Sequence, residues 1–173
     1  VVRQALDEAG LVGAVKTSGS KGVHVVVPLA PGTTTDAAAA TRALAVRAER
    51  VDPALTTTAY LKEDREGKVF LDPTRVGGGT LAAVYSPRVR PGTTVSFPVA
   101  WDDLDAVTPA DFTVRTVPGL LASHPGWQEQ LPAPQELPAD LVAEGHEIPV
   151  ARVQAMHEGK RRKRAREAGG DQG

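Results

Sequence analysis

The residues best suited to binding or catalysis by type and spacing lie in the segment 16–24, which reads KTSGSKGVH. Its two glycines allow the backbone to approach a ligand closely with its N–H groups exposed. Hydroxyl groups, two ammonium groups and the imidazole of His24 lie within the same few residues. Donors combined with positive charge are suited to binding a triphosphate. A polar hairpin turn followed by a strand histidine accounts for the same pattern without any ligand.

Two other motifs share part of this pattern, and both fail on their surroundings. A Walker A loop needs a glycine directly before its lysine and a helix after it, whereas Val15 precedes Lys16 and a strand is expected next. The spacing of Ser18 and Lys21 also matches the serine–lysine pair of penicillin-binding enzymes. That serine begins a helix, but residues 23–29 are β-branched and typical of a strand.

Asp72 is a second candidate, because it follows the apolar run Val69–Leu71. A carboxylate at the end of a buried strand is well placed to hold a metal ion at the sheet edge. The other interpretation is an aspartate that opens a turn before a proline, which is common. Further along, Arg88 and Arg90 are separated by one apolar residue, so in an extended segment both would face one side. An exposed basic edge is the alternative there.

The elements that must position these residues are predicted from periodicity and turn residues. Helices are expected over residues 1–9, with Gly10 as C-cap, over 35–51, with Thr35 and Asp36 as N-caps, and over most of 109–121. Strands are expected over 11–16, 23–29, 68–72 and 81–86, an extended segment over 93–99, a helical turn over 101–104 and a short docked segment over 137–143. The mixture predicts an α+β fold in which helices flank an antiparallel or mixed sheet.

Composition and charge exclude several classes of protein. The 173 residues contain no cysteine, which excludes a disulfide framework and a thiolate metal site and fits a reducing cytoplasm. No apolar run reaches the length of a membrane span, so no membrane partner is expected. The net charge of −1 divides into −5 over residues 1–150 and +4 over residues 151–173. We expect one domain over 1–150 and a basic, disordered tail over 151–173.

Segment 16–29 resembles the second motif of the polymerase domains of bacterial DNA ligase D, within the archaeo-eukaryotic primase superfamily. The similarity extends from residue 1 to about residue 121. In that family a serine, a lysine and a histidine of this motif bind the phosphates of the incoming nucleotide. The corresponding positions in this sequence are Ser18, Lys21 and His24.

Two later segments carry the same resemblance. Segment 68–72 is similar to the third motif, whose aspartate, here Asp72, is a catalytic metal ligand. Segment 85–104 is similar to the downstream signature, whose first arginine, here Arg88, contacts the triphosphate. The resemblance implies a partial primase-polymerase catalytic core that uses Mg²⁺ or Mn²⁺.

The sequence also departs from that family. The first motif of the family is a pair of aspartates one residue apart, and no such pair precedes Lys16. Two-metal nucleotidyl transfer needs three carboxylates to hold two cations about 4 Å apart. The chain begins with Val1 in what reads as the middle of a helix, so we expect further residues upstream. Residues 73–79 replace an amide-rich stretch and a lysine, which suggests a stand-alone or divergent relative.

Three functions are therefore weighed. The resemblance implies a nucleotidyltransferase that adds nucleotides to a DNA primer end in repair or end joining, with nucleoside triphosphates and possible end-joining proteins as partners, in the cytoplasm. The missing aspartate pair favours a non-catalytic relic that binds nucleotide or nucleic acid. The basic run 160–166 suggests an interaction protein whose tail is the working part.

Overall fold

The computed structural model describes residues 1–76, 80–150, 156 and 160. The predicted glycine loop at 77–79 and nearly all of the predicted tail lie outside the described residues. The chain folds as two compact units. The first, here the helical unit, comprises the described parts of Val1–Ala5, Gly32–Gly79 and Leu137–Gly173. The second, here the sheet unit, comprises Leu6–Pro31 and Thr80–Glu136.

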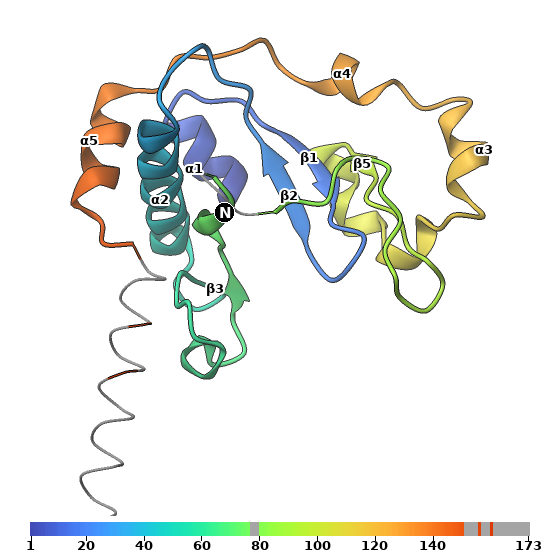
Figure 1. The fold of residues 1–173 in the computed structure, drawn as a ribbon, viewed down its shortest axis with the longest axis horizontal. Helices are drawn as coiled ribbons and strands as arrows, with labels where there is room; N and C mark the ends of the chain where they lie inside the picture. Colours follow the sequence, from blue (N-terminus) through green and yellow to red (C-terminus); the bar gives the residue numbers. More distant parts are fainter. Residues whose placement is uncertain (77–79, 151–155, 157–159, 161–173) are drawn as a thin grey trace, which may run out of the picture. The chain divides into compact units, whose positions relative to one another are not determined.

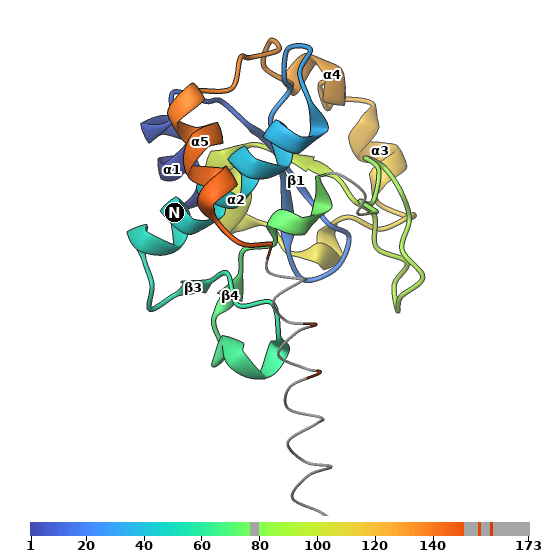
Figure 2. The ribbon, with the colours of Figure 1, turned by 60° about the vertical axis from the view of Figure 1, so that its left-hand side comes forward.

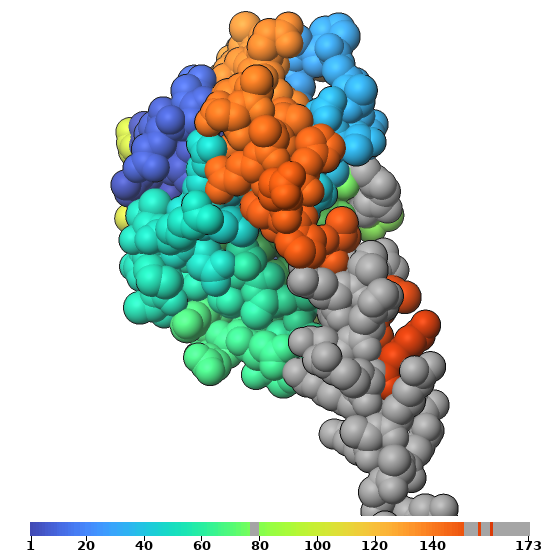
Figure 3. Space-filling model, turned by 90° about the vertical axis from the view of Figure 1, so that its left-hand side faces the viewer, coloured from blue at the N-terminus to red at the C-terminus, as the bar shows by residue number. Residues whose placement is uncertain are grey.

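The helical unit is built on α2 (Thr34–Val51), against which α5 (Ala139–Glu147) packs (Figure 1). Small side chains line the buried side of α2, namely Ala39, Ala40, Ala43 and Ala48. Figures 2 and 3 show α5 lying across α2 from two further directions. The close approach depends on Gly145 of α5, where a Cβ atom would lie 1.9 Å from the Ala39 carbonyl oxygen. Only glycine fits at this crossing.

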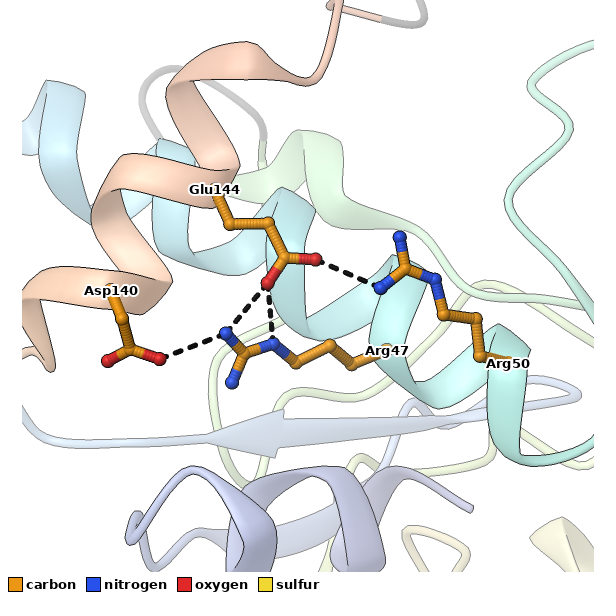
Figure 4. Close-up of polar contacts among 4 residues, drawn as sticks. All are labelled: Arg47, Arg50, Asp140 and Glu144. Atoms are coloured by element: carbon orange, nitrogen blue, oxygen red, sulfur yellow. Dashed lines mark hydrogen bonds and ion pairs between the residues drawn. The ribbon is translucent and has the colours of Figure 1, made fainter.

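An ion-pair network joins the exposed flanks of the same two helices (Figure 4). Arg47 donates to Glu144 at 2.7 Å and to Asp140 at 3.1 Å, and Arg50 donates to the second Glu144 oxygen at 3.2 Å. The hydrogen bonds that Arg47 donates to Glu144 and Asp140 raise the pKa of Arg47 above its ordinary value. Partly exposed pairs of this kind each contribute about 0.2–1 kcal/mol, so the network orients α5 more than it drives its docking.

Short elements complete the helical unit. Strands β3 (Thr56–Thr57) and β4 (Val69–Phe70) pair in parallel. The 3₁₀ helix η1 (Lys62–Arg65) lies between them, and η2 (Pro73–Arg75) follows β4. The boundary between the two units falls within α1 (Val2–Glu8).

The sheet unit contains three antiparallel strands in the order β2–β1–β5. They are β1 (Ala14–Thr17), β2 (Val23–Val26) and β5 (Pro98–Val99). The core cluster behind them consists of Val95, Phe97, Val99, Phe112 and Val117. Phe97 stacks on Phe112 with ring centroids 4.8 Å apart, so two of the chain's three phenylalanines fill this core. The helices of this unit are η3 (Trp101–Ala106), η4 (Pro109–Asp111), α3 (Val117–Leu121) and α4 (Trp127–Gln130).

The predicted α+β class is confirmed, with a small antiparallel sheet and helices. Several boundaries were wrong. The N-cap of α2 is Thr33, whose hydroxyl accepts from the Asp36 N–H, rather than Thr35 or Asp36. The strand expected over 81–86 is irregular, and Tyr85 has a φ of 64° that no regular strand accommodates. The helix expected over 109–121 is interrupted between η4 and α3.

The remaining differences concern length. The strand expected over 23–29 ends at Val26, and α5 extends beyond the docked segment expected over 137–143. The strand expected over 68–72 is reduced to β4 and is not buried, because Val69 is 56% exposed. In the part of the chain that the structure describes, no helix has the length and apolar character needed to cross a membrane.

Candidate functional site

The turn between β1 and β2 (Figure 1) contains two of the predicted phosphate-binding residues, Ser18 and Lys21, and His24 follows in β2. Ser18 closes the turn, because its backbone N–H donates to the Gly22 carbonyl at 2.8 Å. The Ser18 hydroxyl oxygen accepts from the backbone N–H of Ser20 at 3.2 Å and of Gly22 at 3.3 Å. These contacts use its two lone pairs, so the hydroxyl hydrogen is left to donate. Ser18 therefore shapes the turn and can also serve as a donor toward an anion.

Gly19 seats the turn against the segment that carries Arg88. Its φ is 65°, and a Cβ atom there would lie 2.6 Å from Arg88 Cγ and 3.0 Å from the Ser96 nitrogen. The Thr94 hydroxyl donates to the Gly19 carbonyl at 2.6 Å. A side chain at this position would be strained in its backbone and would also clash. The glycine thus brings the turn and the Arg88 side chain into direct proximity.

Lys16 lies at the centre of this site, although it is not among the residues predicted from the sequence to bind phosphate. It faces His24 across the β1–β2 pair and is only 2% exposed. Its Nζ lies 2.9 Å from His24 Nδ1, 2.8 Å from the Ala82 carbonyl oxygen and 2.7 Å from Ser96 Oγ. Burial, followed by the nearby charge of Arg88, lowers the pKa of Lys16 to about 8. The sequence offers one signal for this contact, namely a lysine at the end of the strand expected over 11–16. A lysine in a buried strand rarely lacks specific partners.

Among the described residues, the lysines and the arginine of this site have no acidic ion-pair partner. Within residues 1–76 and 80–150, no carboxylate forms an ion pair with Lys16, Lys21 or Arg88. Lys21 is exposed at the tip of the turn, and Arg88 is half-buried beside Gly19. Cations gathered around a glycine turn, with a hydroxyl donor among them, form an arrangement suited to a polyanion.

Arg88 and Arg90 were expected to face one side of an extended segment, but the segment is not extended. Pro87 forms an isolated antiparallel bridge with Val95, but the chain turns directly afterwards. The Arg90 N–H donates to the Arg88 carbonyl at 2.8 Å, which is incompatible with an extended segment. Val89 between them is fully exposed.

Asp72 belongs to the helical unit, where it caps η2. One carboxylate oxygen accepts from the Thr74 N–H at 3.0 Å and from the Thr74 hydroxyl at 2.6 Å. The other pairs with Arg75 Nε at 2.9 Å. Partial burial opposes ionisation, but the Thr74 hydrogen bonds and the Arg75 charge outweigh it and hold the pKa of Asp72 below its ordinary value. The turn-opening interpretation of this aspartate therefore describes its local structure.

The described residues do not provide a metal site on their own. Among them, no group of three or more His, Cys, Asp or Glu side chains could hold a cation. Asp72 is ionised at neutral pH, as a metal ligand must be, but both of its oxygens already have protein partners. Two cations need more carboxylate ligands than this single side chain.

The five predicted site residues are thus divided between the units. Ser18, Lys21, His24 and Arg88 belong to the sheet unit, and Asp72 belongs to the helical unit. The roles of all five in binding stay predictions.

Comparison with known proteins places most of the chain in one family. Residues 1–127 match the family described as LigD, primase-polymerase domain. The multifunctional non-homologous end joining protein LigD of Mycobacterium bovis is 42% identical over 106 residues, which are 60% of this chain and 14% of that protein. The corresponding LigD of Pseudomonas aeruginosa is 35% identical over 119 residues, which are 67% of this chain and 14% of that protein.

A solved structure shares the fold. The polymerase domain of Mycobacterium tuberculosis ligase D in complex with DNA matches with a TM-score of 0.67 and 37% identity. The match covers 75% of this chain and 46% of that one. The chain therefore spans less than half of the solved domain and a small part of the curated relatives.

Proposed function

The chain belongs to the LigD primase-polymerase domain family, and we propose that it carries the nucleotide-binding part of a nucleotidyltransferase that extends a DNA primer end during end joining. The observation that carries this proposal is the turn between β1 and β2, which offers the Ser18 hydroxyl and the exposed Lys21 and packs against Arg88 at Gly19. Among the described residues neither Lys21 nor Arg88 has an acidic partner. The similarity to the LigD proteins of Mycobacterium bovis and Pseudomonas aeruginosa supports the same assignment.

The geometry suggests a role for each side chain of the turn. The Ser18 hydroxyl donates to a phosphate oxygen, because its lone pairs are already used within the turn. Lys21 and Arg88 neutralise the negative charge of the triphosphate. His24 adds a further ring N–H donor from the neighbouring strand. Donors preorganised in this way also stabilise the charge that develops on the phosphates during transfer.

For the metal site, the described residues support the proposal of a single ligand. We propose Asp72 as one ligand of Mg²⁺ or Mn²⁺, the oxygen-preferring ions implied by the family. The described residues do not complete the ligand set, so no catalytic step is assigned to the ion. DNA and end-joining proteins are proposed as partners from the relatives, among which the solved ligase D domain was determined in complex with DNA. A cytoplasmic location is proposed because the cysteine-free composition fits a reducing compartment.

Binding of a nucleoside triphosphate to the 173-residue chain tests this function. Lys21→Ala should lower the affinity about tenfold or more, because a charge-assisted contact to phosphate is removed. Lys62→Ala, which removes an exposed lysine from η1 in the other unit, is the matched control and should leave affinity unchanged. Equal affinity of the two variants, measured by titration calorimetry, would contradict the assignment of the turn.

The single carboxylate of the predicted metal side favours a second candidate, a chain that binds nucleotide without turning it over. Primer extension with Mg²⁺ or Mn²⁺ distinguishes the two. Triphosphate binding without extension supports the non-catalytic candidate for this chain. Extension that disappears in Asp72→Asn supports the polymerase and shows that the ligand set is complete.

A further inference from the structure

The hairpin over residues 87–95 has a base that is packed and a tip that is not. At the base, the Arg88 N–H donates to the Thr94 carbonyl at 2.7 Å. The Thr94 hydroxyl donates to the Gly19 carbonyl at 2.6 Å, which joins the hairpin to the β1–β2 turn. Every residue of the tip, defined here as residues 89–93, is exposed. The side chains of the tip therefore do not serve the core of the sheet unit.

Backbone hydrogen bonds and turn residues hold the tip in one shape. The Arg90 N–H donates to the Arg88 carbonyl at 2.8 Å, and the Thr93 N–H donates to the Arg90 carbonyl at 2.9 Å. Pro91 and Gly92 are the central residues of the second turn, and Gly92 has a φ of 81°, the positive value that a type II turn requires there. A tip that is already ordered loses little conformational entropy when it binds a partner.

The tip presents a guanidinium beside an apolar side chain. Arg90 is exposed, and within the described residues no carboxylate forms an ion pair with it. Val89 is fully exposed, so the fold gains nothing from its apolar surface. A planar guanidinium matches the oxygens of a phosphate group, and an adjacent apolar group suits a sugar or the face of an unpaired base. These two chemistries alternate along a single strand of nucleic acid.

The two segments that form the turn and the hairpin contain no acid. Residues 11–31 and 80–101 include no aspartate or glutamate. Their basic residues are Lys16, Lys21, Arg88 and Arg90. The two segments therefore carry +4, whereas residues 1–150 together carry −5, so the rest of that range carries −9. Positive charge is thus concentrated on two segments that pack together at Gly19, and such a concentration attracts a polyanion.

We propose that the tip is a second phosphate-binding element, which holds a single strand of DNA through Arg90 and Val89 while the neighbouring turn holds the triphosphate. The inference rests on the proposed function for its DNA partner and names the surface that contacts the strand. Arg88 and Arg90 are two residues apart, so their backbones are at most about 7 Å from each other. Arg88 is nevertheless half-buried against Gly19, whereas Arg90 is exposed. The two guanidinium groups therefore serve different phosphates, one of the nucleotide and one of the strand beside it.

The affinity of the full chain for a fluorescently labelled oligothymidylate, measured by anisotropy at a series of salt concentrations without nucleotide, tests the inference. In Arg90→Ala the affinity should fall about fivefold, because a charge-assisted contact to phosphate is lost. The slope of log affinity against log salt should become shallower by about 0.7, the contribution of one phosphate contact on a single strand. Unchanged affinity and slope in Arg90→Ala would overturn the inference.

Lys62→Ala is the matched control, because it removes an exposed positive charge from η1 in the other unit. Affinity and salt slope should both stay those of the unsubstituted chain. The basic run 160–166 is present in every protein compared, so its own attraction for DNA cancels. Equal losses in Arg90→Ala and Lys62→Ala would show a general effect of net charge and would also overturn the inference.

Val89→Ser separates the apolar contact from the charge. The affinity should fall about threefold at every salt concentration, with the salt slope unchanged, because this side chain releases no counterion. Unchanged affinity would overturn the contact assigned to Val89. Polyglutamate of equal charge, added as a competitor, should displace the labelled strand far less readily than unlabelled oligothymidylate does. Equal displacement would identify the tip as a site for acidic chains in general and would overturn the assignment to DNA.

The two proposals fail separately, because DNA and triphosphate binding are measured each without the other ligand. If DNA affinity depends on Arg90 but no triphosphate binds, the proposed function is lost and the tip stands as a contact for nucleic acid. If triphosphate binds but DNA affinity is independent of Arg90, only the role of the tip is lost.

Discussion

The cations of the two units differ in what they face. On the α2–α5 flank, Arg47 and Arg50 point at the carboxylates of Glu144 and Asp140. In the sheet unit, Lys16 contacts an imidazole, a carbonyl and a hydroxyl, and no described carboxylate pairs with Lys16, Lys21 or Arg88. Paired charges join helices, whereas cations left without acids next to a glycine turn are suited to an anion from outside. The difference distinguishes charges that join two helices from the charges that we propose for binding an anion.

The two sides of this comparison should respond to different substitutions, and the largest effect is expected at the helix crossing. Gly145→Ala places a methyl group against the backbone of Ala39 and forces α2 and α5 apart. We expect a loss of about 3 kcal/mol in the free energy of unfolding, measured by urea denaturation. Gly119→Ala in α3, where nothing lies within 4 Å of the new atom, is the control and should cost nothing. Equal stability of the two variants would contradict the packing described here.

The next effect concerns Lys16 and has opposite signs for binding and for stability. Its folded-state pKa of about 8 lies below the ordinary 10.5, so the unfolded chain holds the proton more tightly. This group therefore makes the free energy of unfolding rise as pH increases from about 8 to 10.5. Triphosphate affinity should fall over the same range, because a positive charge beside the turn is lost.

Denaturation and calorimetry at a series of pH values measure the two trends. Lys16→Arg should flatten both, since its side chain does not titrate there. Affinity that stays constant from pH 7 to 10 in the unsubstituted chain would contradict the role given to Lys16.

The smallest effect is expected on the α2–α5 flank. Glu144→Gln weakens the contacts to Arg47 and Arg50 and should lower the free energy of unfolding by about 1 kcal/mol, less at high salt. Glu147→Gln, an exposed site on the same helix, is the matched control. Neither variant should change triphosphate affinity. A marked loss of triphosphate affinity in Glu144→Gln alone would contradict the distinction between the arginines of the α2–α5 flank and the cations around the β1–β2 turn.

Local signals were enough to predict the turn and most helices. The residues of segment 16–24 specify a tight turn by themselves, and the alanine-rich run that forms α2 has a helical pattern along its own length. The strand expected over 81–86 failed because its backbone is set by contacts with residues 94–96, including a positive φ at Tyr85. The sequence alone could not show this, because the apolar run over residues 81–85 is equally typical of a buried strand.

The site was predicted in part for the same reason. Ser18, Lys21 and His24 lie within the short segment 18–24, so their grouping was visible without a structure. The partners of Lys16 at Ala82 and Ser96 are 66 and 80 residues away in the chain, and no local pattern indicates such contacts. For Asp72 both interpretations were available, and the cap on η2 depends only on Thr74 and Arg75 close by.

The central claim, that the turn between β1 and β2 binds phosphate groups, is tested most directly by titrating the chain with a nucleoside triphosphate and with the same nucleoside lacking phosphates. At equal salt and pH 7, the triphosphate should bind with an affinity that falls as salt is raised, and the nucleoside should bind at least tenfold more weakly. Equal affinity for the two molecules, or no binding of the triphosphate at millimolar concentration, would contradict the account.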